Sequence, residues 1–414
     1  MTVVSPACVA RPIDRMTTTR TVRRVEAFQV PYRAAIADLM HGAPALEDLA
    51  DTYPALLFAL ATGYGTPSQR ERARRLVVAG ASLREAANAI GVAWWLRKLP
   101  AQSLAAPLPA FPAEGDFGQR IGALVPPDPR IASFWLARIG YAIETCSPRY
   151  ALWLARQADL VATADELFVL MAAWAWFSEN EGHLGHRLLR KRWHPDMSFR
   201  RAREELTLWR QRLRLVECLG FGIETPWLND GTAGGYDFVA LRTADDFVAE
   251  SEALDNCLDQ YADQLRTGAS AVFSIRKAGR SIACVEIGLH ETEITMPTIV
   301  QLRTARNRRA PPDIWQAAFA WLGGQRLEPL IPDRHKPSAR KRMDARRKLW
   351  APYLAFLSGT GHETSFRRTV LAPMAARTPP IGMRRILTRR HTELAAEPTG
   401  DATGRLPPMM RARA

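Results

Sequence analysis

Hydrophobic residues recur with a helical period along most of the first 230 residues. Between residues 31 and 100, short apolar segments are separated by glycine-containing turns, and this pattern predicts a helical lobe. Repeated prolines over residues 101–129 predict a connector, because proline removes a backbone donor and blocks helix formation. The helical period resumes over residues 130–230 and predicts a bundle. Its expected helices lie near 130–144, 149–158, 164–177 and 198–219.

The period changes from helical to alternating near residue 231. Residues 231–330 therefore predict a small domain with a three- to four-stranded antiparallel meander and flanking helices. The chain as a whole is expected to be an α+β protein, mainly helical in its N-terminal and central regions. The expected strands span 236–241, 270–277, 281–289 and 297–304, and the expected helices span 243–256, 257–268 and a segment opened by Pro311 and Pro312.

Strand parity divides the meander into two chemically different faces, because successive side chains of a strand point to opposite sides. The apolar face is expected to carry Phe273, Ile275, Val285, Ile287, Val300 and Leu302. The polar face is expected to carry Ser274, Arg276, Cys284, Glu286, Gln301 and Arg303. Two interpretations of the polar face stay open: a half-solvated surface with charges paired across strands, or a groove closed by the helix over residues 257–266.

The positive charge of the chain is concentrated near its C-terminus. The net charge is +14, and residues 333–414 carry 18 Lys and Arg against 6 Asp and Glu. Residues 331–414 are expected to form a basic tail, mostly disordered after a possible helix through Leu357, and residues 1–30 a disordered leader. The tail is either a solubilising extension or a contact for a polyanion.

Composition argues against several classes of protein. The five cysteines are scattered without a disulfide framework or zinc spacing, so we expect a reducing, cytoplasmic location, no metal and no cofactor. The longest apolar run, residues 167–177, is about half the roughly 20 residues that a membrane helix needs, so no membrane span is expected.

Residues 82–99 have the outline of a helix-turn-helix. Ala87, Ile90, Gly91 and Val92 stand where that motif places its small, apolar and turn residues. The expected second helix is short and carries Trp94 and Trp95, which suit a core better than a DNA groove. DNA reading by this segment is an alternative hypothesis.

The segment around Cys257 carries the candidate chemistry. Asp255, Asp259 and Asp263 step by four and would form one acidic stripe if the helix were continuous. Cys257 lies near the expected helix start, where the helix dipole favours a thiolate and the flanking aspartates oppose it, so a half-buried packing cysteine is expected.

These residues resemble the PcfJ-like family, named for a conjugative-plasmid protein and found on mobile elements and in bacterial chromosomes. The family core runs His-Cys-Val-Gly-x-Tyr, a glycine before a strand ending Ser-Leu-Arg, Thr-hydrophobic-Glu, and Gln-x-x-Gly-x-x-Asn. The matching positions are Asn256 to Tyr261, Gly268 with Phe273 to Arg276, Cys284 to Glu286, and Gln301 to Asn307. Asn256, Asp259 and Cys284 depart from the family pattern, so a base adjacent to Cys257 is missing. The resemblance implies a fold and a context without an established activity.

Charge distribution and resemblance together favour a binding protein over an enzyme. The leading hypothesis is a cytoplasmic accessory protein that binds DNA, RNA or a nucleoprotein partner through the polar face, the arginine-rich segment 302–309 and the tail. The binding candidates are Asn256, Cys257, Tyr261, Ser274, Arg276, Glu286, Gln301, Arg303, Arg306, Asn307, Arg308 and Arg309. The alternative is a hydrolase or nuclease with candidate catalytic residues Cys257, Glu286, Asp255 and Asp259.

Overall fold

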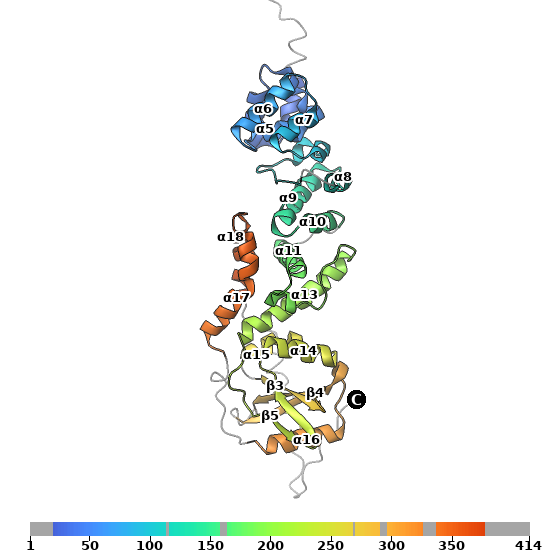
Figure 1. The fold of residues 1–414 in the computed structure, drawn as a ribbon, viewed down its shortest axis with the longest axis vertical. Coiled ribbons are helices and arrows are strands. Elements are labelled where there is room, and N and C mark those ends of the chain that lie inside the picture. The colour runs from blue at the N-terminus through green and yellow to red at the C-terminus, as the bar shows by residue number, and fades with distance from the viewer. Residues whose placement is uncertain are drawn as a thin grey trace, which may run out of the picture. The chain divides into compact units, whose positions relative to one another are not determined.

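The computed structural model describes residues 20–112, 116–157, 164–267, 270–289, 296–325 and 337–376. The chain divides into two compact units (Figure 1). Unit 1 comprises Met1–Trp209 and Leu349–Val370, and unit 2 comprises Arg210–Lys348 and Leu371–Ala414. Two helices, α13 (Phe199–Leu219) and α17 (Ala339–Leu357), each belong partly to one unit and partly to the other.

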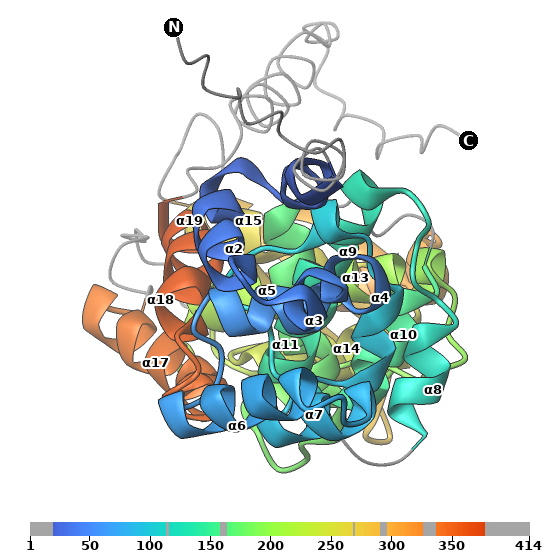
Figure 2. The same cartoon turned by 90° about the horizontal axis from the view of Figure 1, so that it is seen from above.

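Unit 1 is helical, as expected from the periodicity of residues 31–100 and 130–230. Within it, α6 and α7 lie side by side (Figure 2). Its N-terminal elements are η1 (Val30–Tyr32), α2 (Arg33–Met40), α3 (Pro44–Glu47), α4 (Leu49–Thr52), α5 (Pro54–Ala61), α6 (Pro67–Val78), α7 (Leu83–Ile90), η2 (Trp94–Lys98) and η3 (Ala101–Ser103). Its later elements are α8 (Phe117–Gly122), α9 (Pro129–Thr145), α10 (Pro148–Ala155), α11 (Asp165–Glu179), α12 (Leu184–Arg187), the first half of α13, the second half of α17, α18 (His362–Phe366) and the π-helix η8 (Arg367–Leu371).

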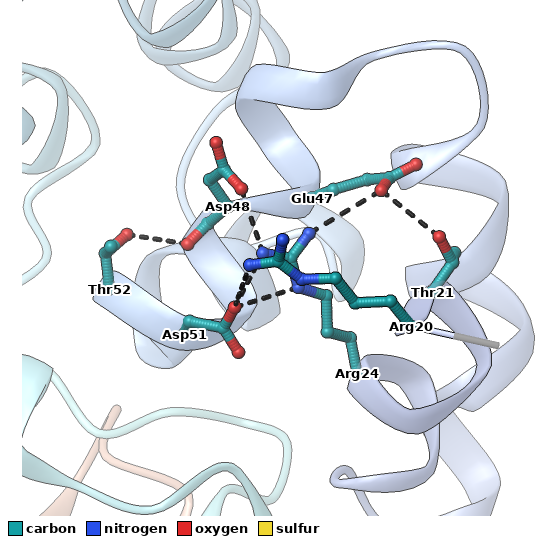
Figure 3. Close-up of polar contacts among 7 residues, drawn as sticks. All are labelled: Arg20, Thr21, Arg24, Glu47, Asp48, Asp51 and Thr52. Atoms are coloured by element: carbon teal, nitrogen blue, oxygen red, sulfur yellow. Dashed lines mark hydrogen bonds and ion pairs between the residues drawn. The ribbon is translucent and has the colours of Figure 1, made fainter. Parts of the chain in front are cut away.

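The predicted leader is too long, because residues 20–26 form a helix that is anchored to the lobe. Arg24 is only 7% exposed, and its guanidinium Nη2 lies 2.6 Å from the Asp51 carboxylate and 2.9 Å from the Asp48 carboxylate (Figure 3). Glu47 lies 3.6 Å from its Nη1. A buried cation needs this compensation, so the ion pairs fix the helix on α3 and α4. Residues 1–19 of the predicted leader lie outside the described residues.

The connector is also more structured than expected. It contains the 3-10 helix η3 and the helix α8, and Leu104, Leu108 and Phe117 are buried. Residues 101–129 thus add apolar side chains to the core of unit 1.

The helix-turn-helix outline forms only in part. The Ser82 hydroxyl caps α7 by accepting from the Glu85 N–H, and Gly91 ends this helix in the left-handed region with a φ of 77°. The following segment, η2, is a five-residue 3-10 helix in which Trp95 is 4% exposed. The part of the motif that would enter the DNA groove is therefore not an α-helix here, and its tryptophan belongs to the core.

Aromatic side chains from distant parts of the sequence form the core of unit 1. Helix α11 is buried along most of its length, as its apolar sequence predicts. Its Phe177 packs on Trp209 of α13 and on Trp350 and Tyr353 of α17, with ring centroids 5.7 to 6.1 Å apart. The second half of α17 is therefore part of this core.

Unit 2 contains a five-stranded antiparallel sheet in the order β1-β2-β3-β4-β5. Its strands are β1 (Gly231–Ala233), β2 (Tyr236–Ala240), β3 (Ser270–Lys277), β4 (Arg280–Leu289) and β5 (Pro297–Thr304), and its helices are α14 (Ala244–Leu254), η5 (Leu258–Gln260), α15 (Ala262–Thr267), η6 (Ala305–Asn307), α16 (Pro312–Gly323) and α19 (Ala372–Ala376). Four strands match the prediction closely. The fifth, β1, was missed because Gly231, Thr232 and Ala233 carry no alternating hydrophobic signal.

The apolar face of the sheet packs on α16, and α14 and α15 lie on the other side (Figure 1). Trp321 of α16 stacks on Phe238 with centroids 4.7 Å apart and also contacts Phe273. Ile275 and Val285 of this face are fully buried. The α+β class is thus confirmed.

One assignment on the apolar face is wrong. Val300 is 50% exposed, because the β4–β5 register shifts between Glu286, which pairs with Gln301, and Ile287, which pairs with Ile299. Val300 is the extra residue of this bulge and leaves the face, while Ile299 packs against the apolar core.

Two further expectations need correction. The helix expected over residues 257–268 is broken into η5 and α15, and Gly268 lies outside the described residues. In the tail predicted to begin at residue 331, the possible helix through Leu357 is present as α17, and further helical segments follow from His362 to Ala376, where disorder was expected; residues 377–414 lie outside the described residues. No helix in the described ranges is both long and apolar enough to cross a membrane.

Candidate functional site

The predicted polar face forms, and other segments of unit 2 cover part of it. Backbone pairing sets Ser274 opposite Cys284, Cys284 opposite Arg303, and Glu286 opposite Gln301. Ser274 is fully buried and Cys284 is 8% exposed, because the segment from α14 through Tyr261 lies over this face. The face is thus covered over Ser274 and Cys284, while Arg276, Glu286, Gln301 and Arg303 stay partly exposed, so each interpretation describes part of it.

Glu286 is the centre of one hydrogen-bond network on this face. Its Oε1 accepts from the Ser270 hydroxyl at 2.6 Å, and its Oε2 accepts from the Gln301 amide at 2.6 Å and from the Tyr261 hydroxyl at 3.2 Å. Gln301 also donates to the Tyr261 oxygen. Burial, and then the neighbouring Glu286, raises the pKa of Tyr261, which keeps its phenol protonated as a donor. Three recognised positions thus converge, and their hydrogen bonds are made within the fold.

A second network lies between α14 and the sheet, around a residue that the sequence analysis missed. Glu250 is 3% exposed, its Oε2 accepts from Ser281 at 2.8 Å, and Ser281 lies 3.3 Å from the Ser274 hydroxyl. Arg276 donates to Ser274 at 3.1 Å. Burial raises the pKa of Glu250, opposed by the hydrogen bonds from Ser281 and Ser274 and by the charge of Arg276.

The missed glutamate had a signal in the sequence. Glu250 follows Phe247 by three positions and precedes Leu254 by four, so it lies on the buried stripe of α14. A carboxylate on such a stripe requires a polar partner, and the serines of β3 and β4 supply it.

The two cysteines of the site have different surroundings. Cys257 is exposed, which corrects the expected half-buried position, and its sulfur accepts from the Asn307 amide at 3.7 Å. Cys284 is buried and accepts from the Asn256 amide at 3.7 Å. Burial, reinforced by Glu250, Cys257 and Glu286 and opposed by Arg303, raises the pKa of the Cys284 thiol to about 12. Cys284 is therefore a protonated packing group at neutral pH.

A cysteine–histidine pair is absent from the described part of unit 2, whose described residues contain no histidine. The position that is histidine in the PcfJ-like pattern is Asn256, and its amide serves Cys284 and the backbone of Leu258. This arrangement supplies no base to Cys257.

The acidic stripe does not form, because the chain turns at Asp255 and again at Tyr261. Asp255 is the left-handed cap of α14, with a φ of 46°, and its exposed carboxylate lies 3.2 Å from Arg306. Asp259 is buried and accepts from Arg212 at 3.0 Å. These aspartates therefore serve separate ion pairs.

Partners from α13 account for the two buried aspartates. Arg212 is 1% exposed and contacts Glu252 as well as Asp259, and Arg214 pairs with Asp263. Buried carboxylates with such partners stabilise the placement of η5 and α15. The described ranges contain no group of three or more side chains that could hold a metal ion.

The polar residues at the end of β5 face solvent. We call residues 303–309 the arginine loop. It is closed by a β-bridge between Arg303 and Arg309 and by a 3.0 Å hydrogen bond from the Thr304 N–H to the Arg308 carbonyl. Arg306 and Asn307 adopt left-handed conformations, with φ of 57° and 55°, which turns the loop back on itself.

The structure thus separates the predicted binding residues into two groups. The covered group is buried or partly buried and comprises Asn256, Tyr261, Ser274, Arg276, Glu286 and Gln301; the second group comprises the partly buried Arg303 and the exposed Cys257, Arg306, Asn307, Arg308 and Arg309. Asn307–Cys257 and Arg306–Asp255 contacts join the two groups through the segment before η5.

Comparison with known proteins adds no assignment: no family model, no characterised protein and no solved structure matches this chain. The resemblance to the PcfJ-like family consequently stays a prediction that rests on the quoted residues.

Proposed function

We propose that this protein binds nucleic acid by its phosphate backbone, and that the arginine loop of unit 2 is the contact surface. The observation that carries the proposal is that three arginines of this loop have no carboxylate partner among the described residues. Arg303, Arg308 and Arg309 form no ion pair with any carboxylate among the described residues, whereas Arg306 pairs with Asp255. Arg308 and Arg309 are exposed.

Phosphate is the ligand that such a surface suits best. Guanidinium groups bind phosphate through parallel N–H donors and gain affinity by releasing condensed counterions. The β-bridge between Arg303 and Arg309 and the paired turn at Arg306 and Asn307 hold the backbone in one conformation, which reduces the entropy lost on binding.

The covered polar face then has a positioning role. Glu286 and Gln301 fasten β4 and β5 to Tyr261, and the arginine loop follows directly from β5. The proposed contact surface is therefore smaller than the one expected from the sequence, which included the whole polar face.

The C-terminal residues would add to this contact. Residues 377–414 contain eight arginines and three acidic residues, a composition that supports sequence-independent attraction to polyanions. Because the PcfJ-like resemblance implies a mobile-element context, DNA is the first ligand to test and RNA the second.

The test compares two double variants in binding to fluorescein-labelled DNA and RNA by anisotropy, from about 50 to 200 mM salt. Arg308→Ala/Arg309→Ala should weaken binding and lower the salt slope by about 2, one for each lost phosphate contact. The matched control is Arg72→Ala/Arg75→Ala on α6, where both arginines are also exposed.

An equal loss of nucleic-acid affinity in the two double variants would mean that binding depends on net charge alone. Absence of binding by the native chain at low salt would refute the proposal. Deleting residues 377–414 separates the contribution of that segment, because the cut falls after the last described helix.

A further inference from the structure

An exposed aromatic side chain lies beside a strongly basic helix segment of unit 2. Phe221, in the turn that follows α13, is 55% exposed, and the Nζ atom of Lys348 lies 5.6 Å from the centroid of its ring. The first half of α17, residues 339–348, contains six Lys and Arg against one Asp. Neither the ring nor these cations belong to the arginine loop, so they form a second basic surface of unit 2.

Backbone packing fixes the position of this ring against α17. Gly220 and Gly222 have φ of 60° and 129°, which turns the chain on both sides of Phe221. A Cβ atom at Gly220 would lie 3.3 Å from the carbonyl oxygen of Lys341, so the turn lies directly against the first turns of the helix. Lys341 and Lys348 are seven residues apart and share one side of α17. Phe221 therefore lies along that side.

This surface has a surplus of positive charge. Three of the six cations are paired with acidic residues, as Lys341–Glu224, Arg346–Glu217 and Arg347–Asp344. Arg340, Arg342 and Lys348 form no ion pair among the described residues. The dipole of α17 opposes a cation in its first turn, so Arg340 does not stabilise the helix by its position. We call the exposed residues Phe221, Arg340 and Lys348 the α17 patch.

We propose that the α17 patch binds single-stranded nucleic acid, with one base stacked on Phe221 and neighbouring phosphates bound by Lys348 and Arg340. An aromatic ring stacks on any base that is free of its duplex partner, and adjacent cations follow the backbone. The exposed Lys348 ammonium lies near the roughly 6 Å limit of a cation–π contact, so it can move from the ring to a phosphate when a base arrives. The inference rests on the proposed function and specifies single strands as its ligand.

A lipid surface is the competing ligand for a basic helix. A helix that lies in a membrane interface needs a broad apolar face, because its affinity increases with the apolar area that it buries. In the first half of α17, Met343 is the one exposed large apolar side chain, and Leu349 and Trp350 of the second half are buried in the core. Nucleic acid is therefore the better match.

The test measures fluorescence anisotropy of the full chain with three fluorescein-labelled probes of equal length. These are a single-stranded DNA, the same strand made abasic, and a duplex. The abasic strand keeps the phosphates and lacks the bases. The native chain should bind the intact single strand at least about fivefold more tightly than the abasic strand, the lower end of the effect of one base–aromatic stack.

A matched pair of variants assigns the stacking to Phe221. Phe221→Leu keeps an apolar side chain and removes the ring, so it should weaken binding of the intact single strand by about fivefold or more and leave the abasic strand and the duplex within about twofold. The control is Phe319→Leu on α16, because Phe319 is similarly exposed, at 53%, and α16 contains no Lys or Arg. This control should bind all three probes like the native chain.

A second variant assigns the phosphate contacts. Arg340→Gln/Lys348→Gln should weaken binding of the intact and abasic single strands alike. The slope of log affinity against log salt should fall by about 1.4 in magnitude, because each phosphate contact to a single strand contributes about 0.7. Unchanged circular dichroism shows that each variant is folded.

Four results would overturn the inference. These are equal affinity of the native chain for the intact and abasic strands, equal loss in Phe221→Leu and Phe319→Leu, an unchanged salt slope in Arg340→Gln/Lys348→Gln, and a loss in Phe221→Leu that affects only binding to phosphatidylserine vesicles. The last result would assign the patch to a lipid surface.

The two proposals fail separately. If Arg308→Ala/Arg309→Ala binds every probe like the native chain, the arginine-loop contact is refuted, and the Phe221→Leu result still decides the role of the α17 patch. If that double variant loses affinity while Phe221→Leu does not, the α17 patch alone is refuted. No binding of any probe by the native chain at about 50 mM salt would refute both.

Discussion

At the scale of single residues, two carboxylates have different environments: Glu286 on the polar face of the sheet, and Glu250 on α14, which packs against that face. Glu286 accepts from three side chains. Glu250 is almost fully buried, accepts directly from Ser281, and its Oε1 has no hydrogen-bond partner among the described residues. A carboxylate with several donors tolerates its charge, and a buried one with few donors favours the protonated form.

Glu250→Gln should therefore stabilise the protein at neutral pH. The folded-state pKa of Glu250 is raised by burial, so the stabilisation that its protonated form contributes is full below the unfolded pKa and is lost as pH rises through the folded pKa. The variant cannot ionise, so its free energy of unfolding should exceed that of the native chain by about 1 kcal/mol at pH 8 and match it near pH 4.

Urea unfolding at both pH values measures this difference. Glu26→Gln, at an exposed position, is the control and should show no pH-dependent difference. A variant that is less stable than the native chain at pH 8 would show that the Arg276 charge outweighs the cost of burial.

At the scale of elements, the hairpin between β3 and β4 depends on two residues with positive φ. Ala278 and Gly279 have φ of 49° and 75° in the turn that joins the strands. Both central residues of a type I′ turn adopt this conformation, and asparagine followed by glycine is its preferred pair. Alanine at the first position is therefore a local strain that the rest of the sheet compensates.

Ala278→Asn should raise the free energy of unfolding by about 0.5 to 1 kcal/mol, because asparagine enters the left-handed region at lower cost. Gly279→Ala is the paired test and should lower it by about 1 kcal/mol. A methyl group at residue 279 meets no atom within 4 Å, so that loss reports the backbone conformation alone. Midpoints of urea denaturation give both values, and a stabilising Gly279→Ala would contradict the turn.

The alternation of hydrophobic and polar residues predicted the strands of unit 2 well. It succeeded where the burial of a side chain depends only on its position within its own strand. Four strands and the two faces followed from alternation over residues 236–304. Val300 was misplaced because a bulge arises from the pairing of β4 with β5, which one strand does not encode. The break between η5 and α15 was missed because Asp259 is held by Arg212, 47 residues earlier in the chain.

Of the candidate site residues, the structure brings three together at Glu286, and their exposure was predicted less well. Glu286 and Gln301 came together because they pair on neighbouring strands, and Tyr261 reaches them from the segment between η5 and α15. Sequence could not show that α14 covers the neighbouring Ser274 and Ser281, since this covering depends on tertiary packing. The turn of the arginine loop was likewise not predicted, because Arg306 adopts a left-handed conformation that residues other than glycine rarely enter.

At the scale of the whole molecule, the chain leaves unit 1 within α13 and returns to it within α17. The returning segment supplies Trp350 and Tyr353, which are 1% and 0% exposed. Tyr353 also donates a 3.0 Å hydrogen bond to the Thr145 carbonyl, and His362 lies 2.6 Å from Glu144. The strongly basic first half of α17 concealed this role, because composition over residues 334–348 resembles a disordered tail.

Two truncations test this arrangement. A chain ending at Ala376 should unfold within about 0.5 kcal/mol of the full chain, because all described elements remain. A chain ending at Lys348 should lose at least about 3 to 5 kcal/mol of stability in unit 1, the cost of removing one large buried aromatic side chain. Thermal unfolding followed by near-ultraviolet circular dichroism measures the tryptophan environment, and equal transitions for the two truncations would contradict the assignment.

The return of the chain through α17 also imposes an order of events during synthesis. The first 209 residues emerge from the ribosome without the aromatic side chains of residues 349–370. At about 5–20 residues per second, roughly 10 to 30 s pass before that segment is translated. The sheet of unit 2 can form in this interval, so unit 2 is expected to fold before unit 1. Until residues 349–370 are translated, the helices of unit 1 leave part of their apolar surface uncovered, where chaperones can bind.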